Sequence, residues 1–131
     1  MKKFLLMISL CFMCLFLNGC NNNVDISISY NTDNIYIVAD SYSNKIEHDK
    51  INSFELKDSI IYDNLLLDGI KYDNSEIGIF ENDELGKYIS YLEKDSTKCI
   101  IIYVEENIPV VIGLTNTDKL DELHNKLVEL A

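Results

Sequence analysis

The 131-residue sequence has no arginine, no tryptophan, a single proline and only five glycines. With 47% hydrophobic residues, this composition excludes collagen-like, low-complexity and disordered classes. All eleven basic residues are lysines, and against 22 Asp and Glu they leave a formal net charge of −11. Nucleic-acid binding needs clustered cations that displace counterions, so we expect no nucleic-acid partner. A single small acidic domain is the expected organisation.

The N-terminal segment has the layout of a secretion signal. Lys2 and Lys3 precede an apolar run over residues 4–17, and polar residues close the run. These 14 apolar residues fall short of the roughly 20 that a membrane-spanning helix needs. The sequence therefore predicts export rather than a stable transmembrane span.

The stretch Leu17-Asn18-Gly19-Cys20 resembles the lipobox of bacterial lipoproteins. The resemblance implies that Leu17 and Gly19 direct cleavage, that residues 1–19 are removed, and that the Cys20 thiol is acylated with diacylglycerol. Residues 20–24 would then be a lipidated tether, and the protein would be anchored on the outer side of the cytoplasmic membrane. Ordinary secretion with a free Cys20 is the alternative.

The cysteines give no other motif. Cys11 and Cys14 lie in the apolar run and would leave with the signal, so Cys99 would be the only unmodified thiol of the mature chain. No intrachain disulfide is then possible, and stability must come from a packed core. We expect Cys99, which precedes an aliphatic strand, to pack as a small hydrophobe.

Strands dominate the expected structure, because isoleucine and valine outnumber leucine after residue 19 and apolar residues alternate with polar ones. Strands are predicted at residues 26–31, 35–39, 43–47 and 51–58, as a four-stranded meander with a turn at residues 48–50. A long crossover with one short strand follows over residues 60–86. Further strands are expected at residues 87–93, 99–104 and 108–114. Residues 100–102 are apolar on both faces and predict a central strand, whereas Pro109 predicts the start of an edge strand.

The C-terminal segment changes period. Leu120, Leu123, Leu127 and Leu130 recur at helical spacing, and Asn116 or Thr117 can cap the helix. An amphipathic helix is therefore expected to close the chain, with all four leucines against the core.

Over residues 25–131 the chain resembles small bacterial pleckstrin-homology-like (PH-like) domains. The resemblance runs from Asp68-Gly69 through Gly78-x-Phe80 and Gly86-Lys87-Tyr88-Ile89 to the aliphatic strands at residues 100–102 and 110–114 and the closing helix. It implies a mainly β fold, a partly open barrel of about seven strands closed by one C-terminal helix.

Motifs for catalysis and metal binding are sparse. His48 and His124, the only histidines, lack metal-ligand spacing, and no nucleophile elbow, zinc-protease motif or phosphate loop occurs. Asp73, Gly78 and Glu84 fall at calcium-loop positions 1, 6 and 12, but Ile77 at position 5 offers no side-chain oxygen. We therefore expect no enzyme activity, no cofactor and no metal site.

Three functions remain as hypotheses. The first is a non-catalytic envelope lipoprotein whose domain binds a protein or peptide partner, for example by strand addition at an open sheet edge, with a basic partner favoured by the charge. The second is a ligand- or cation-binding accessory lipoprotein that uses the acidic loops between Asp63 and Glu84. The third, an envelope hydrolase, has no motif in its favour. Inositol-lipid binding is disfavoured, because nine lysines after residue 19 provide no basic rim.

Overall fold

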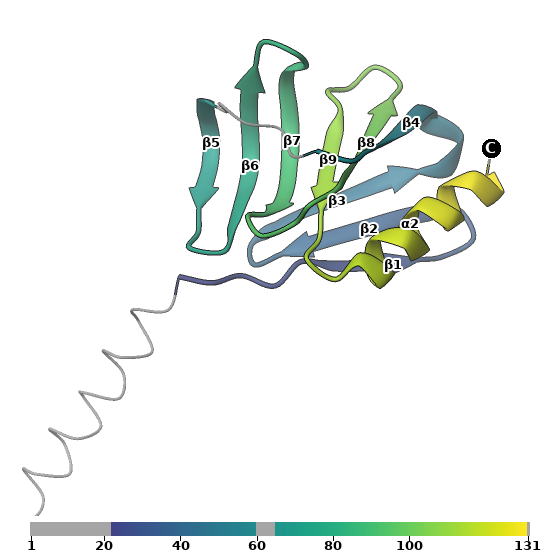
Figure 1. Cartoon of the computed structure of the whole chain (residues 1–131). Helices are drawn as coiled ribbons and strands as arrows, with labels where there is room; N and C mark the ends of the chain where they lie inside the picture. Colours follow the sequence, from purple (N-terminus) through teal and green to yellow (C-terminus); the bar gives the residue numbers. More distant parts are fainter. Residues whose placement is uncertain (1–21, 60–64, 131) are drawn as a thin grey trace, which may run out of the picture.

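The computed structural model describes residues 22–59 and 65–130. Leu17, Gly19 and Cys20, on which the predicted signal and lipid anchor depend, lie outside the described residues. The described part contains nine β-strands, one 3₁₀ helix and one α-helix (Figure 1). In chain order these are β1 (Ser27–Tyr30), β2 (Asn34–Ala39), β3 (Tyr42–Glu47), η1 (His48–Lys50), β4 (Ile51–Lys57), β5 (Leu65–Lys71), β6 (Ser75–Asn82), β7 (Gly86–Glu93), β8 (Cys99–Val104), β9 (Val110–Gly113) and α2 (Thr117–Leu130).

The first three strands form an antiparallel sheet in the order β1-β2-β3. Their alternation is the one that the sequence predicts, because Ile35 and Ile37 are fully buried while neighbouring residues reach the surface. At the first turn the Asn31 side-chain oxygen accepts hydrogen bonds from the backbone N–H groups of Asp33 and Asn34, at 2.9 and 2.7 Å. This side chain stabilises the turn in the way expected of asparagine.

The predicted four-stranded meander is wrong at its fourth strand. After η1, strand β4 leaves the first sheet and pairs with β8 in a second sheet, with Phe54 opposite Ile102 and Leu56 opposite Ile100. The reason lies in β8, whose residues are apolar on both faces and need a neighbour along each edge inside the protein. β4 supplies one of those neighbours.

The second sheet has six strands in the order β4-β8-β9-β7-β6-β5. Residues 100–102 are fully buried in β8, which is an interior strand with neighbours on both sides but lies second from one edge of the sheet. β9 lies between β8, to which it is antiparallel, and β7, to which it is parallel. The expectation that Pro109 begins an edge strand is therefore wrong. Pro109 precedes the ladder by one residue and contributes only its carbonyl, which accepts a 2.8 Å hydrogen bond from the N–H of Ile89, so its missing donor costs nothing.

The expected crossover over residues 60–86 instead contains two paired strands, β5 and β6. They approach closely at Gly69 and Gly78, which face each other across the ladder. A Cβ on Gly69 would lie 2.2 Å from the carbonyl oxygen of Ile77, and Gly78 has a φ of +127°. Only glycine accommodates both the contact and the dihedral. These glycines, and the turn at Asp73 and Asn74, interrupt the apolar pattern without ending the sheet.

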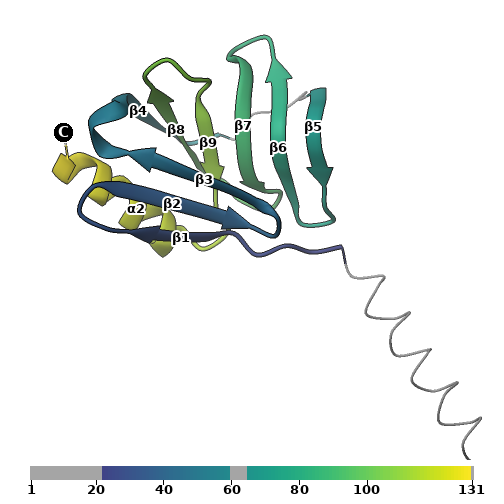
Figure 2. The same cartoon turned by 180° about the vertical axis from the view of Figure 1, so that it is seen from behind.

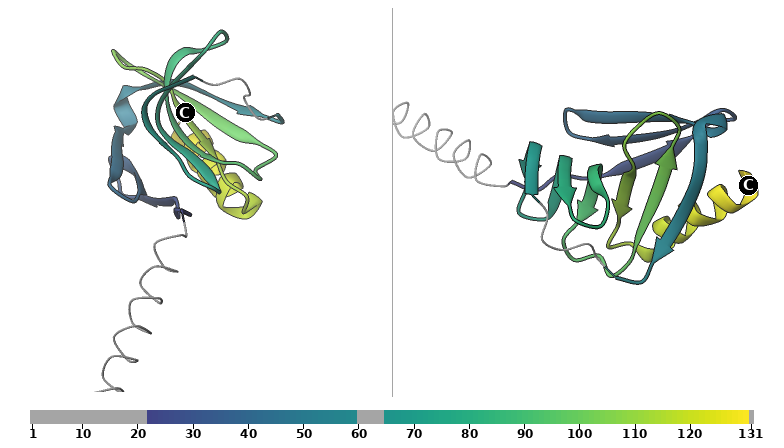
Figure 3. Two further views of the ribbon diagram at one scale, coloured as in Figure 1. Left: turned by 90° about the vertical axis from the view of Figure 1, so that its left-hand side faces the viewer. Right: turned by 90° about the horizontal axis from the view of Figure 1, so that it is seen from above.

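The two sheets stack as layers, and α2 fills the space between them on one side (Figures 2 and 3). Leu120, Leu123 and Leu127 are buried in the shared core, whereas Leu130, expected beside them, is 41% exposed in the last turn. The Asn116 side chain caps α2 by accepting hydrogen bonds from the N–H groups of Asp118 and Lys119. The fold is thus mainly β with one C-terminal helix, as predicted. The sheets do not close into a barrel, and the described part has nine strands instead of about seven.

Candidate interaction surface

Strand β5 is an outer edge of the six-stranded sheet, and it lies beyond the part that the three-stranded sheet covers. Figures 1 and 3 show β5 and β6 extending past β1, β2 and β3. Among residues 22–59 and 65–130, β5 pairs only with β6, so its outer edge carries backbone N–H and C=O groups with no described strand beside them. An uncovered strand edge of this kind can pair with another chain.

Apolar side chains accompany this free edge. Leu65, Leu67 and Ile70 are 60%, 43% and 41% exposed, and they are half of the exposed large hydrophobic residues in the described part. The strand register places Ile70 beside Ile77 and Leu65 beside Glu81, on the face of the sheet that carries the main core. Half-buried Ile79 lies on the same face. We call Leu65, Leu67, Ile70 and Ile79 the β5 surface.

A β-bulge shapes this surface. The register of β5 against β6 shifts between Leu66 and Asp68, which leaves Leu67 as the extra residue. A bulge increases the local twist and re-aims side chains, here at a point next to the close glycine contact. Leu66 turns to the opposite face, where it packs against Phe80 and its neighbours. Sequence reasoning identified residues 65–67 as an apolar group but could not show that two of them face solvent.

An N-terminal arm, residues 22–24, is attached to the turn between β5 and β6. The Asn74 side chain accepts a hydrogen bond from the N–H of Val24, at 3.0 Å, and donates one to the carbonyl of Val24, at 2.8 Å. The N–H of Asp73 donates to the carbonyl of Asn22, at 2.9 Å, and Val24 is 93% buried in the main core. We call these contacts the arm clamp. The sequence pattern indicates only a turn at Asn74, and it contains no signal for this contact with Val24.

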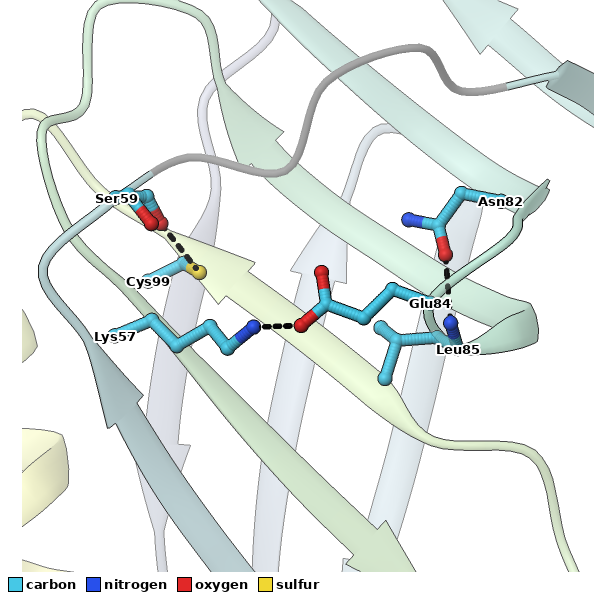
Figure 4. Close-up of polar contacts among 6 residues, drawn as sticks. All are labelled: Lys57, Ser59, Asn82, Glu84, Leu85 and Cys99. Atoms are coloured by element: carbon cyan, nitrogen blue, oxygen red, sulfur yellow. Dashed lines mark hydrogen bonds and ion pairs between the residues drawn. The ribbon is translucent and has the colours of Figure 1, made fainter.

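The opposite face of the six-stranded sheet carries a second apolar cluster that includes Phe80, Tyr88, Cys99 and Ile101. Cys99 is fully buried, as expected, and its thiol donates a 3.5 Å hydrogen bond to the carbonyl of Ser59 (Figure 4). Burial raises the pKa of this thiol to about 11. Because the thiolate is the nucleophile, such a thiol is unreactive at neutral pH.

Two polar features border this cluster. Lys57 and Glu84 form an ion pair between β4 and the β6–β7 loop, and the hydrogen bond to Glu84 raises the pKa of Lys57 (Figure 4). The Tyr88 hydroxyl is buried without a hydrogen-bond partner in the described part, and burial raises its pKa. Tyr88 stacks on Phe80 with ring centroids 6.2 Å apart, which is an apolar packing role.

The residues considered for metal binding are not brought together. His124 packs edge-on against Phe54, with ring centroids 5.8 Å apart, and His48 lies in η1. In the calcium-loop comparison, Asp73 is in a turn while Gly78 lies within the extended strand β6, so the segment does not wrap around a cation. Among residues 22–59 and 65–130, no three His, Cys, Asp or Glu side chains are grouped to hold a metal ion.

The surface also has hollows beside α2. One of about 190 Å³ lies between β1 and the helix and is lined by Ile26, Ile28, Tyr30 and Glu122, among others. Burial, with a smaller effect of Glu122, raises the pKa of Tyr30 to about 12. A second hollow of about 90 Å³ lies between β4 and the end of α2 and includes His48 and Phe54. Neither brings together an acid and a base at hydrogen-bonding distance.

Comparison with known proteins gives no relative: no family model, curated protein or solved structure matches this chain. In the described part, no helix has the length and apolar character required to span a membrane.

Proposed function

We propose that this chain is a non-catalytic envelope lipoprotein whose β domain binds a protein partner through the β5 surface. The observation that carries the proposal is the combination of a free strand edge with three exposed apolar side chains. An extended segment of the partner would add a strand to β5 and place alternate apolar side chains on the β5 surface.

Charge defines the chemistry of the partner. The chain has a net charge of −11, and Asp68 and Glu81 lie next to the apolar side chains of β5. A segment that alternates apolar residues with lysine or arginine would match both features. A second copy of this chain would bring the same negative charge and be repelled.

The membrane anchor in this proposal is supported by the sequence alone. Lysines, a short apolar run, and Leu17, Gly19 and Cys20 in register are the features of a lipobox signal. Lipidation at Cys20 would place the domain on the outer side of the cytoplasmic membrane.

A PH-like relationship is part of the proposal as well. It is supported by two stacked sheets and by a C-terminal helix whose buried leucines fill the gap between them. In this proposal the domain is a PH-like fold whose barrel is open and which has two additional strands.

The binding surface can be tested by site-specific photo-crosslinking in intact cells that make the protein. A photo-reactive residue replaces Leu67 or, as control, Val38, which is 44% exposed but lies on β2 in the other sheet. We expect a discrete crosslinked product from position 67 only, and its loss when Ile70→Asp is added. A product of twice the chain mass would identify a second copy as the occupant, and equal labelling at both positions would refute the surface.

The anchor can be tested with Cys20→Ser. We expect the variant to lose acylation and either to leave the membrane fraction or to accumulate as an uncleaved precursor. Unchanged labelling with a radioactive fatty acid would refute lipidation at this residue, whatever the result at β5.

A further inference from the structure

The arm clamp holds the chain that follows Cys20 against one end of the domain. Asn22 is held through its carbonyl, Val24 through both backbone groups, and the Val24 side chain is buried. Cys20 precedes Asn22 by two residues, and two residues of extended chain span at most roughly 7 Å. A lipid anchor on Cys20 would therefore be attached to the chain within two residues of the segment that the β5–β6 turn holds.

Other hydrogen bonds hold the same turn in the body of the protein. The Tyr72 hydroxyl donates to Asp40 at the tip of the β2–β3 hairpin, at 3.2 Å. The N–H of Lys94, at the end of β7, donates to the carbonyl of Asn74, at 2.8 Å. The clamp is thus attached to both sheets, so an orientation imposed on the arm is imposed on the whole domain.

From these contacts we propose that the arm clamp orients the domain on the bilayer, with the β5–β6 turn toward the lipid surface and the β6–β7 and β8–β9 loops away from it. The inference rests on the proposed lipidation of Cys20. Besides the partner of the β5 surface, the protein would then face the bilayer that holds its own anchor.

The orientation limits the partner of the β5 surface. Ile70 lies at the clamp end of β5, and Leu65 is five residues further along, at about 3.3 Å per residue or roughly 17 Å. The whole β5 surface then stands within a few nanometres of the lipid. The partner segment must be juxtamembrane, which fits a membrane protein of the same envelope better than a soluble protein.

The test uses the full chain, purified after acylation in bacteria and reconstituted into vesicles that contain a headgroup-spin-labelled lipid. A fluorophore is attached to Asp95→Cys, beside the clamp, or to the matched variant Asp83→Cys at the far end. Both replace an exposed aspartate, and buried Cys99 does not compete for the label. We expect severalfold stronger quenching at position 95 than at position 83.

Asn74→Ala, made in both labelled proteins, removes the two side-chain hydrogen bonds of the clamp to Val24 and so weakens it. We expect the difference between the two positions to shrink while the circular dichroism spectrum stays unchanged. Equal quenching of the two positions in the unmutated clamp, or a difference that survives Asn74→Ala, would overturn the inference. Failure of the protein to float with vesicles at all would overturn the lipid anchor instead, which separates the two proposals.

Discussion

Replacement of Leu123 by alanine tests the packing of α2, the only α-helix in the described part. Leu123 is fully buried in the main core, between the two sheets. Truncating such a side chain removes its burial and leaves a cavity, which costs about 2–5 kcal/mol. The total stability of a domain of this size is about 5–15 kcal/mol. We therefore expect Leu123→Ala to remain folded but to lose a large part of its stability, and Leu123→Asp, which buries an unpaired charge, to unfold.

The assay is urea denaturation followed by far-ultraviolet circular dichroism, with thermal melting as a second measurement. A loss of 2 kcal/mol or more should lower the melting temperature by about 10 °C or more in a domain of this length. Val128→Ala is the matched control, because Val128 lies on the same helix and is 53% exposed. Its effect should stay within about 0.5 kcal/mol. If the two variants lose similar stability, the helix does not close the core in the way described.

Three further predictions concern the six-stranded sheet. Gly78→Ala should destabilise the protein more than Gly86→Ala in the same urea assay, because a Cβ at position 78 would lie 2.4 Å from a backbone oxygen while that at position 86 meets open space. For Cys99, the folded state keeps a proton that the unfolded state releases above its ordinary pKa of 9.0. The contribution of this thiol to stability should therefore be constant below pH 9 and fall between pH 9 and about 11, and this part of the loss should be absent from Cys99→Ala. Glu84→Gln breaks the ion pair with Lys57 but should change the free energy of unfolding by less than about 1 kcal/mol, because the carboxylate is half exposed. A loss well above that value would show that the pair is shielded from solvent.

The spacing of apolar residues in the sequence predicted those strands, and the helix, that have one or both faces buried. The alternation at Ile35 and Ile37, the apolar run at residues 100–102 and the leucine spacing after Thr117 correspond to β2, β8 and α2. In each case burial follows from the period of the chain itself. The Asn116 cap was predictable for the same reason, because it depends on residues within one turn.

Pairing between distant segments could not be predicted in this way. Nothing in the residues of β4 shows that it joins β8 and not β3, and the period of β9 does not reveal neighbours on both sides. Proline normally indicates an edge strand, and for this reason Pro109 pointed to an edge. Here Pro109 lies just before the ladder and its carbonyl accepts a hydrogen bond from β7, which the sequence does not place. These features depend on contacts between residues far apart in the chain.

The candidate site could not be predicted from the sequence pattern, for a further reason. Leucine and isoleucine normally indicate a core, and only the position of the three-stranded sheet leaves Leu65, Leu67 and Ile70 uncovered. The arm clamp likewise depends on a contact between Asn74 and Val24, 50 residues apart. An asparagine in a turn usually forms hydrogen bonds with neighbouring backbone groups, so its sequence context does not indicate a contact with a distant segment.

The position of β9 between β7 and β8 has a consequence for the order of folding. β7 and β8 are consecutive in the chain, yet the strand that joins them is synthesised last. Until residues 110–113 have left the ribosome, β4 with β8 and β5 with β6 and β7 can form only as two separate halves. The six-stranded sheet can therefore be completed only when most of the chain has been synthesised.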